Sequence, residues 1–329
     1  GGGVWWASSR QAPAAVAGSP ASGSSLATGT AGASVVTTRE SASRLASTIY
    51  LEFDHPHGIA LDEARGRLFV AGFEAAAVAV VNVRTADVVD ELAVGSQPQQ
   101  IVIDERSGLL LVACGGSSTV EFFDLASLAK RGTIATAGGA LRLTLDSNLG
   151  VAYVLAQESS SIQVIDLSTR AQKGEVFVGG QPRALALDVE SGAGYVVDWA
   201  DGSLSAVDLA TGDAVQRITV GTDPIDVKLA PAYRLALVAN QGSHSVSVVD
   251  LDTKAVKETV PIGEHPSRIA VDEAAGAAYV SCLGDGVNVI DLRTLQMIRV
   301  LPAGPRPTGL ALDSSSGELY VTNFQVFAS

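Results

Sequence analysis

The sequence predicts an all-β fold, a seven-bladed β-propeller built from four-stranded antiparallel blades. One observation is a series of prolines spaced 42, 42, 42, 42, 42 and 41 residues apart, in which Ala140 takes the place of one proline. The series is Pro56, Pro98, Ala140, Pro182, Pro224, Pro266 and Pro307. A second observation is a bulky residue followed by valine, which keeps the same spacing from Phe69-Val70 to Tyr320-Val321. A repeat of about 40–50 residues with several short β segments is typical of a propeller, so seven repeats predict seven blades.

Repeat 4 shows how one blade is built. We expect its four strands at residues 184–187, 194–197, 204–207 and 214–220, with turns at 188–192 and 208–212. Gly221 to Pro224 then cross to the next blade. Short strands punctuated by Gly, Asp and Pro follow the rules for consecutive hairpins.

Two series of aspartates repeat with the blades and are interpreted as turn residues. An Asp side chain can accept backbone N–H groups in a turn, and a glycine can take the positive φ that closes it. In the first series each Asp precedes a Gly by four residues, whereas repeat 5 has Ala230 and Arg234 at these places. The first series is Asp62, Asp104, Asp146, Asp188, Asp272 and Asp313, and the second is Asp124, Asp166, Asp208, Asp250 and Asp291.

The ring is expected to close by combining both ends of the chain in one blade. The last repeat starts at Pro307 and runs out after its second strand, so residues 34–37 and 47–51 are predicted to complete the seventh blade. Residues 34–329 are thus assigned to the propeller. Residues 1–33 are predicted to be a flexible Gly/Ala/Ser-rich tail. Because the sequence begins with Gly1, either a targeting peptide has been removed or the chain is a fragment.

Composition restricts the function classes. The formal net charge of −13 disfavours nonspecific binding to DNA, RNA or anionic lipid. The sequence contains no run of 18 apolar residues, so it predicts no transmembrane segment. Cys114 and Cys282 occupy equivalent positions in repeats 2 and 6, too far apart for a disulfide, and are interpreted as small buried residues.

The repeat resembles the YVTN-type β-propeller repeats of surface-layer and quinoprotein-like proteins. The best matches are Tyr320-Val321-Thr322-Asn323, Leu237-Val238-Ala239-Asn240 and Val246-Ser247-Val248-Val249-Asp250-Leu251. The resemblance covers roughly residues 54–329 and implies an exported binding or scaffold protein, periplasmic or at the cell surface. It carries over no catalytic residue, because the matched positions are core and turn positions.

Propellers bind ligands around the channel mouth, on the face formed by the crossovers between blades and the loops between second and third strands. The residues expected to form a ligand-binding site on that face are His57, Arg142, Arg183, Arg268, Gln100, Asp226, Trp199, His244 and His265. The arginines lie near the start of the first strand in their blades and could converge on an anionic ligand. Trp199 could stack on a ring, and His244 and His265 could approach each other across adjoining blades.

Several functional readings remain open. A metal site finds little support, since His55 and His57 lie in another part of the ring from His244 and His265 and no spacing matches a zinc motif. No cofactor and no catalytic residue is expected. The leading interpretation is an exported, non-enzymatic binding or scaffold propeller that contacts other protein subunits or a small anionic ligand. The alternatives are a periplasmic enzyme, or a dehydrogenase- or lactonase-like subunit, using the His/Arg face, and, disfavoured by the net charge, binding of single-stranded nucleic acid.

Overall fold

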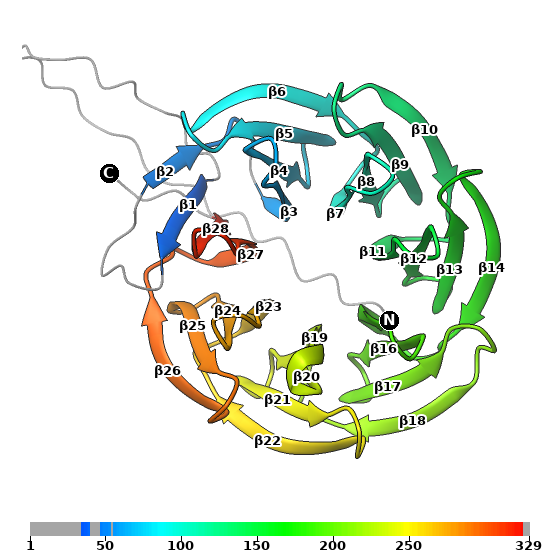
Figure 1. Cartoon of the computed structure of the whole chain (residues 1–329), viewed down its shortest axis with the longest axis vertical. Helices are drawn as coiled ribbons and strands as arrows, with labels where there is room; N and C mark the ends of the chain where they lie inside the picture. Colours follow the sequence, from blue (N-terminus) through cyan, green and yellow to red (C-terminus); the bar gives the residue numbers. More distant parts are fainter. Residues whose placement is uncertain (1–33, 40–46, 54, 325–329) are drawn as a thin grey trace, which may run out of the picture. The chain divides into compact units, whose positions relative to one another are not determined.

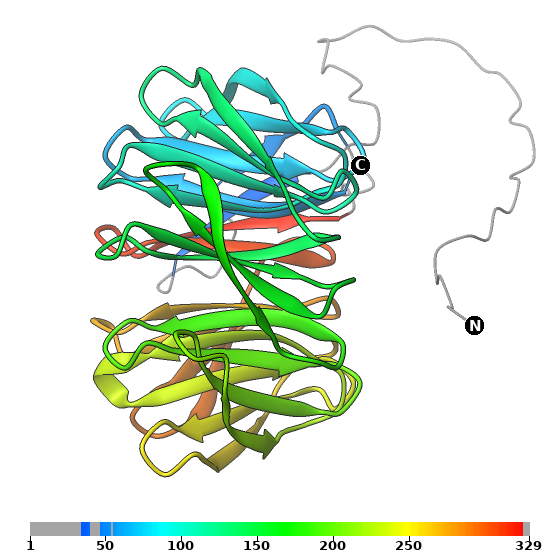
Figure 2. The same cartoon turned by 90° about the vertical axis from the view of Figure 1, so that its right-hand side faces the viewer.

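The computed structural model describes residues 34–39, 47–53 and 55–324. Over these residues, seven four-stranded antiparallel sheets surround a central axis (Figure 1). Figure 2 shows the same ring from the side. The predicted seven-bladed propeller is therefore confirmed. In the described residues, no helix is long and apolar enough to cross a membrane.

Each blade runs from an innermost strand at the channel to an outermost strand at the rim. The blades, from the innermost strand outward, are β3 (Pro56–Asp62), β4 (Arg67–Gly72), β5 (Ala77–Asn82) and β6 (Asp87–Ala93); β7 (Pro98–Asp104), β8 (Leu109–Cys114), β9 (Thr119–Asp124) and β10 (Lys130–Ala135); β11 (Ala140–Asp146), β12 (Val151–Ala156), β13 (Ser161–Asp166) and β14 (Ala171–Phe177); β15 (Pro182–Asp188), β16 (Ala193–Asp198), β17 (Ser203–Asp208) and β18 (Ala214–Thr219); β19 (Pro224–Ala230), β20 (Leu235–Asn240), β21 (Ser245–Asp250) and β22 (Ala255–Pro261); β23 (Pro266–Asp272), β24 (Ala277–Cys282), β25 (Gly286–Asp291) and β26 (Gln296–Leu301); and β27 (Pro307–Asp313), β28 (Glu318–Asn323), β1 (Ser34–Arg39) and β2 (Ser47–Tyr50).

The seventh blade joins the two ends of the described chain, as the sequence predicts. Strand β1 lies between β28 and β2, with Val36 opposite Val321 and Val35 opposite Ile49. Figure 1 shows β1 and β2 beside the C-terminal strands β27 and β28. Strands from distant parts of the chain thus pair in one blade and close the ring. The two ends of the described chain therefore leave no unpaired blade edge where the ring begins and ends.

The hydrophobic core lies between the blades. The described residues form seven apolar clusters, and each cluster joins two neighbouring blades. The second and third strands of each blade are buried on both faces, which explains their almost continuous Val, Leu, Ile and Ala composition. The outermost strands β6, β14, β22 and β26 are largely exposed and bury one inward side chain each, such as Leu92 in β6 or Val260 in β22, whereas β10 buries none.

Both aspartate series form turns as expected. In the second series the Oδ1 atom accepts backbone N–H groups two and three residues on, as Asp166 does from Ser168 and Thr169 at 3.0 and 2.9 Å. In the first series, Asp146 Oδ1 accepts the N–H groups of Asn148 and Leu149 at 2.9 Å each. The six glycines that follow this series have φ between +61° and +72°. The aspartates therefore serve the fold.

Repeat 5 has a different connection in place of this turn. Its β19–β20 connection is a short 3₁₀ helix, Pro231–Tyr233, that ends at Arg234 with φ of +53°. Arg234 then reaches the Asp252 carboxylate at 2.8 Å. The departure that the sequence shows at Ala230 and Arg234 is thus a local change of turn type within an unchanged blade.

Candidate functional site

The innermost strands place equivalent residues of all seven repeats around the channel. Each strand shows a register irregularity just after its first residue, where the chain leaves the crossover. The residue two positions after the crossover proline, or after Ala140, defines what we call the channel ring. Its members are Gly58, Gln100, Arg142, Ala184, Asp226, Arg268 and Gly309.

Six of the seven ring members line one cavity on the channel axis, Ala184 being the exception. His57, Gln99 and Lys228 add further polar side chains to its wall. The cavity leaves about 90 Å³ for water-sized molecules. Since one water needs roughly 10–15 Å³ measured in this way, the space suits a few waters or a compact ligand.

Two ring members each join their blade to the next one through a hydrogen bond of the same kind. Gln100 Oε1 accepts the N–H of Leu143 in the next blade at 2.9 Å, and Asp226 Oδ2 accepts the N–H of Ile269 in the next blade at 2.9 Å. Both residues are therefore fixed by the main chain of the next blade. Asp226 is only 4% exposed, and the one hydrogen bond of its carboxylate among the described residues is made by Oδ2, which leaves Oδ1 without a partner there.

The two arginines of the ring are held by main-chain carbonyls rather than by carboxylates. Arg142 Nη1 donates to Leu141 O at 3.0 Å, and Arg268 Nη1 donates to Ser267 O at 2.8 Å. Neither guanidinium forms an ion pair with a carboxylate in the part of the chain that the structure describes. A guanidinium carries five N–H donors, and these contacts use one of them in each side chain.

Burial dominates the electrostatics of these arginines. Arg142 is 7% exposed, and desolvation lowers its pKa to about 9, assisted by Arg268 nearby and opposed by Asp226. Desolvation also lowers the pKa of Arg268, again opposed by Asp226. Both groups are cations at neutral pH, because arginine side chains are not deprotonated in proteins. The cavity wall thus holds three cationic side chains, including Lys228, and one carboxylate, in a protein whose net charge is −13.

His57 faces this cavity as a neutral group. Its ring stacks on Phe73 with centroids 4.5 Å apart. Burial, with further contributions from Arg268 and Arg142, lowers its pKa to about 3, although a hydrogen bond with Gln99 opposes the change. His55 has different surroundings: its Nδ1 lies 2.8 Å from Glu74 Oε1 and its ring stacks on Phe324 at 4.2 Å. His57 can therefore donate or accept a hydrogen bond in the channel without adding charge.

Arg183 and Trp199 lie outside the cavity wall. The Arg183 guanidinium lies over the Trp199 ring, 5.5 Å from its centroid. Arg183 follows its crossover proline directly, one position before the channel ring, so its side chain does not repeat the placement of Arg142 and Arg268. Its charge still contributes to lowering the pKa of Arg142. The expected convergence therefore holds for two of the three arginines.

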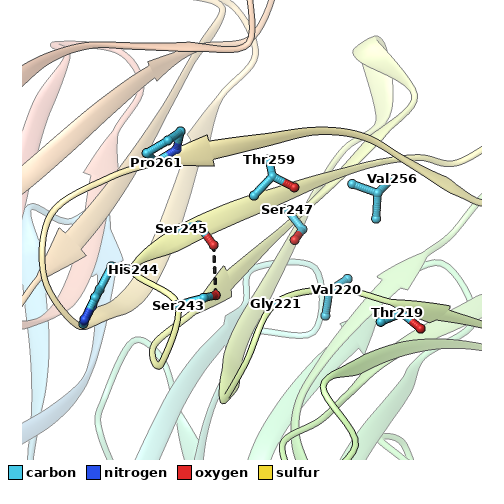
Figure 3. A pocket seen from close by; sticks show the side chains of 10 residues that line it. All are labelled: Thr219, Val220, Gly221, Ser243, His244, Ser245, Ser247, Val256, Thr259 and Pro261. Carbon is cyan, nitrogen blue, oxygen red and sulfur yellow. Dashed lines mark hydrogen bonds between the residues drawn. The ribbon is translucent and has the colours of Figure 1, made fainter.

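His244 and His265 meet each other, away from the channel cavity. The N–H of His265 donates to His244 Nδ1 at 3.0 Å, and the two rings stand nearly perpendicular with centroids 4.8 Å apart. His244 lines an open pocket of about 470 Å³ (Figure 3). Figure 3 shows His244 and Pro261 at one end of the pocket, Val256 and Thr219 at the other, and the Ser243–Ser245 hydrogen bond of 3.0 Å between them.

This rim pocket is less suited to an anion than the channel is. No Lys, Arg, Asp or Glu lines it. The described residues also hold no group of three or more His, Cys, Asp and Glu that could bind a metal ion. The charged side chains described above therefore gather at the channel ring and not at the pocket beside His244.

Comparison with known proteins identifies the family. The family model described as YNCE-like beta-propeller matches residues 57–325. The chain belongs to the YNCE-like β-propeller family. This agrees with the resemblance to YVTN-type repeats in the sequence. A search of curated proteins found no match.

A solved structure similar to this YNCE-like propeller is Kuenenia stuttgartiensis hydrazine synthase. The two share 16% sequence identity with a TM-score of 0.71, over 86% of this chain and 99% of that one. At this identity the likeness shows the fold alone.

The cavity of the YNCE-like propeller brings together five of the residues expected from the sequence: His57, Gln100, Arg142, Asp226 and Arg268. It leaves Arg183, Trp199, His244 and His265 elsewhere. Sequence reasoning missed Lys228 as a site residue. Lys228 follows Asp226 by two positions, and residues two apart in a strand share a face. That alternation is the signal that could have identified it.

Proposed function

We propose that this YNCE-like propeller is an exported, non-enzymatic binding protein whose channel ring takes a small anion. The observation that carries the proposal is the cationic surplus of the channel cavity. Arg142 and Arg268 line a confined space whose wall holds a single carboxylate, Asp226, and neither arginine forms an ion pair in the described residues. A charge buried without a counter-charge costs several kcal/mol, so a ligand that neutralises it would be strongly favoured.

The available donors match a carboxylate or a phosphate-like oxyanion. Guanidinium groups recognise such oxygens through paired N–H donors. Neutral His57 and the amides of Gln99 and Gln100 add polar groups that can orient a ligand. The cavity is too small for a polymer segment, which is a further argument against nucleic-acid binding in this channel.

Thermal unfolding and calorimetric titration with small anions test the proposal. The wild-type protein should bind an anion such as phosphate with one site per chain, at an ionic strength held constant with sodium chloride. The double variant Arg142→Met/Arg268→Met should lose this binding. Arg84→Met is the matched control, because Arg84 is an exposed arginine of the β5–β6 turn, and it should bind as the wild type does. Equal binding by the double variant would refute the proposal.

The wider expectations remain predictions. Periplasmic or cell-surface localisation, association with other protein subunits, and the enzyme-subunit alternative rest on the sequence reading. Fractionation of the source cells and mild purification of the native protein would test the first two.

A further inference from the structure

Building on the proposed channel site, we propose that its ligand is a compact oxyanion that carries a proton of its own, of the hydrogenphosphate type. The inference rests on Asp226, the single carboxylate of the cavity wall. In the channel ring, Asp226 lies on a blade between those of Arg142 and Arg268. Its negative charge would repel an anion that those arginines bind. A ligand that carries a proton can instead donate a hydrogen bond to this carboxylate.

Asp226 is held so that one oxygen is occupied and the other is open. Oδ2 accepts the N–H of Ile269 at 2.9 Å, which fixes the carboxylate against the next blade. Oδ1 has no partner among the described residues, and the side chain lines the cavity. An ionised carboxylate can only accept hydrogen bonds. A ligand group next to Oδ1 must therefore donate one.

This requirement separates two anions of similar shape. A hydrogenphosphate ion has a P–OH group that can donate to Asp226 Oδ1 while its other oxygens accept from Arg142 and Arg268. A sulfate ion at neutral pH has acceptor oxygens only, so one of them would lie against the carboxylate. Two like charges in a buried site repel strongly, and a buried acceptor left unpaired loses its hydrogen bond to water as well.

The ring itself supplies a comparison within the protein. Gln100 occupies the equivalent position in the second blade and makes the same bond to the next blade, Oε1 to Leu143 N at 2.9 Å. A neutral amide can therefore perform the structural role at this position. The carboxylate of Asp226 adds a charged acceptor facing the cavity, which the blade interface does not require.

Calorimetric titration of the wild-type protein with phosphate and with sulfate, at constant ionic strength and pH 7, tests the inference. Phosphate should bind at least tenfold more tightly than sulfate. Glycolate and acetate form a second matched pair, and glycolate should bind more tightly because it adds one hydroxyl donor. Sulfate binding equal to or tighter than phosphate binding would overturn the inference while leaving the channel site intact. Binding of neither ion would refute the channel site itself.

The variant Asp226→Asn adds a second test. The amide oxygen can keep the bond to Ile269 N, and the amide nitrogen can donate to a fully ionised oxyanion. Sulfate should therefore bind at least tenfold more tightly than to the wild type, and the preference for phosphate should shrink. A variant that keeps the full preference would contradict the assigned role of Asp226. If the variant folds poorly, the phosphate-to-sulfate ratio of the wild type still decides.

Discussion

Replacing Arg142 with methionine should stabilise the unliganded protein, although the residue is buried and hydrogen-bonded. The pKa of Arg142 falls from 12.5 to about 9, chiefly through desolvation. Since a tenfold change in a proton equilibrium corresponds to about 1.4 kcal/mol, this fall corresponds to a penalty of about 5 kcal/mol for holding the charge in the folded state. The bond to Leu141 O returns about 1 kcal/mol. Replacement of buried ion pairs by apolar residues is often neutral or stabilises a protein by about 1–4 kcal/mol, and for this unpaired buried charge we expect a gain in that range of about 1–4 kcal/mol.

Thermal unfolding measures this change directly. A domain of this size gains roughly 2 °C in Tm for each kcal/mol, so the Arg142→Met variant should melt several degrees above the wild type in a buffer without oxyanions. Saturating phosphate should raise the Tm of the wild type and leave that of the variant nearly unchanged. Arg84→Met should change neither value. An unchanged or lower stability of the variant would refute the reasoning, because the contacts of the guanidinium, including its hydrogen bond of about 1 kcal/mol, would then outweigh the cost of its desolvation.

Three further outcomes follow from the structure. His57 has its pKa lowered from 6.5 to about 3 in the folded state, so its contribution to stability is complete above pH 6.5 and is lost as the pH falls toward 3, by about 2 kcal/mol at pH 5. In the His57→Gln variant, the unfolding free energy measured with urea should fall less between pH 7 and pH 5 than it does in the wild type. An unchanged pH dependence would contradict the lowered pKa of His57. Arg170, exposed and at φ of +53°, should tolerate glycine with a gain of about 1 kcal/mol in unfolding free energy, whereas a clear loss would show an unrecognised contact. Cys114 and Cys282 are free and buried, and burial raises the pKa of both thiols to about 12, so iodoacetamide at pH 8 should label them only after unfolding; rapid labelling of the native protein would disprove this.

The repeat made the ring positions readable from the sequence. A residue's distance from its crossover proline fixes its strand and its place along the channel, so Arg142, Asp226 and Arg268 could be grouped although they lie in different blades. The closing of the seventh blade could be predicted in the same way, because the final repeat lacks two strands and residues 34–37 and 47–51 can supply them.

The surroundings of individual side chains were harder to predict from the sequence. Arg183 precedes the ring position by one residue, and the strand there has an irregular register, so alternation does not fix where its side chain points. Its contact with Trp199 arises from the tertiary structure. The neutral state of His57 depends on burial and on two arginines from other blades, which no local pattern reveals. The predicted tail of residues 1–33 lies outside the described residues.

The most direct measurement of the central claim is a crystal structure of the protein with arsenate, a protonated analogue of hydrogenphosphate, located by the anomalous signal of arsenic. The account requires one strong peak on the channel axis, in contact with the guanidinium groups of Arg142 and Arg268 and with one oxygen facing Asp226 Oδ1. A channel occupied by water alone, with arsenate bound only at the rim or not at all, would contradict it.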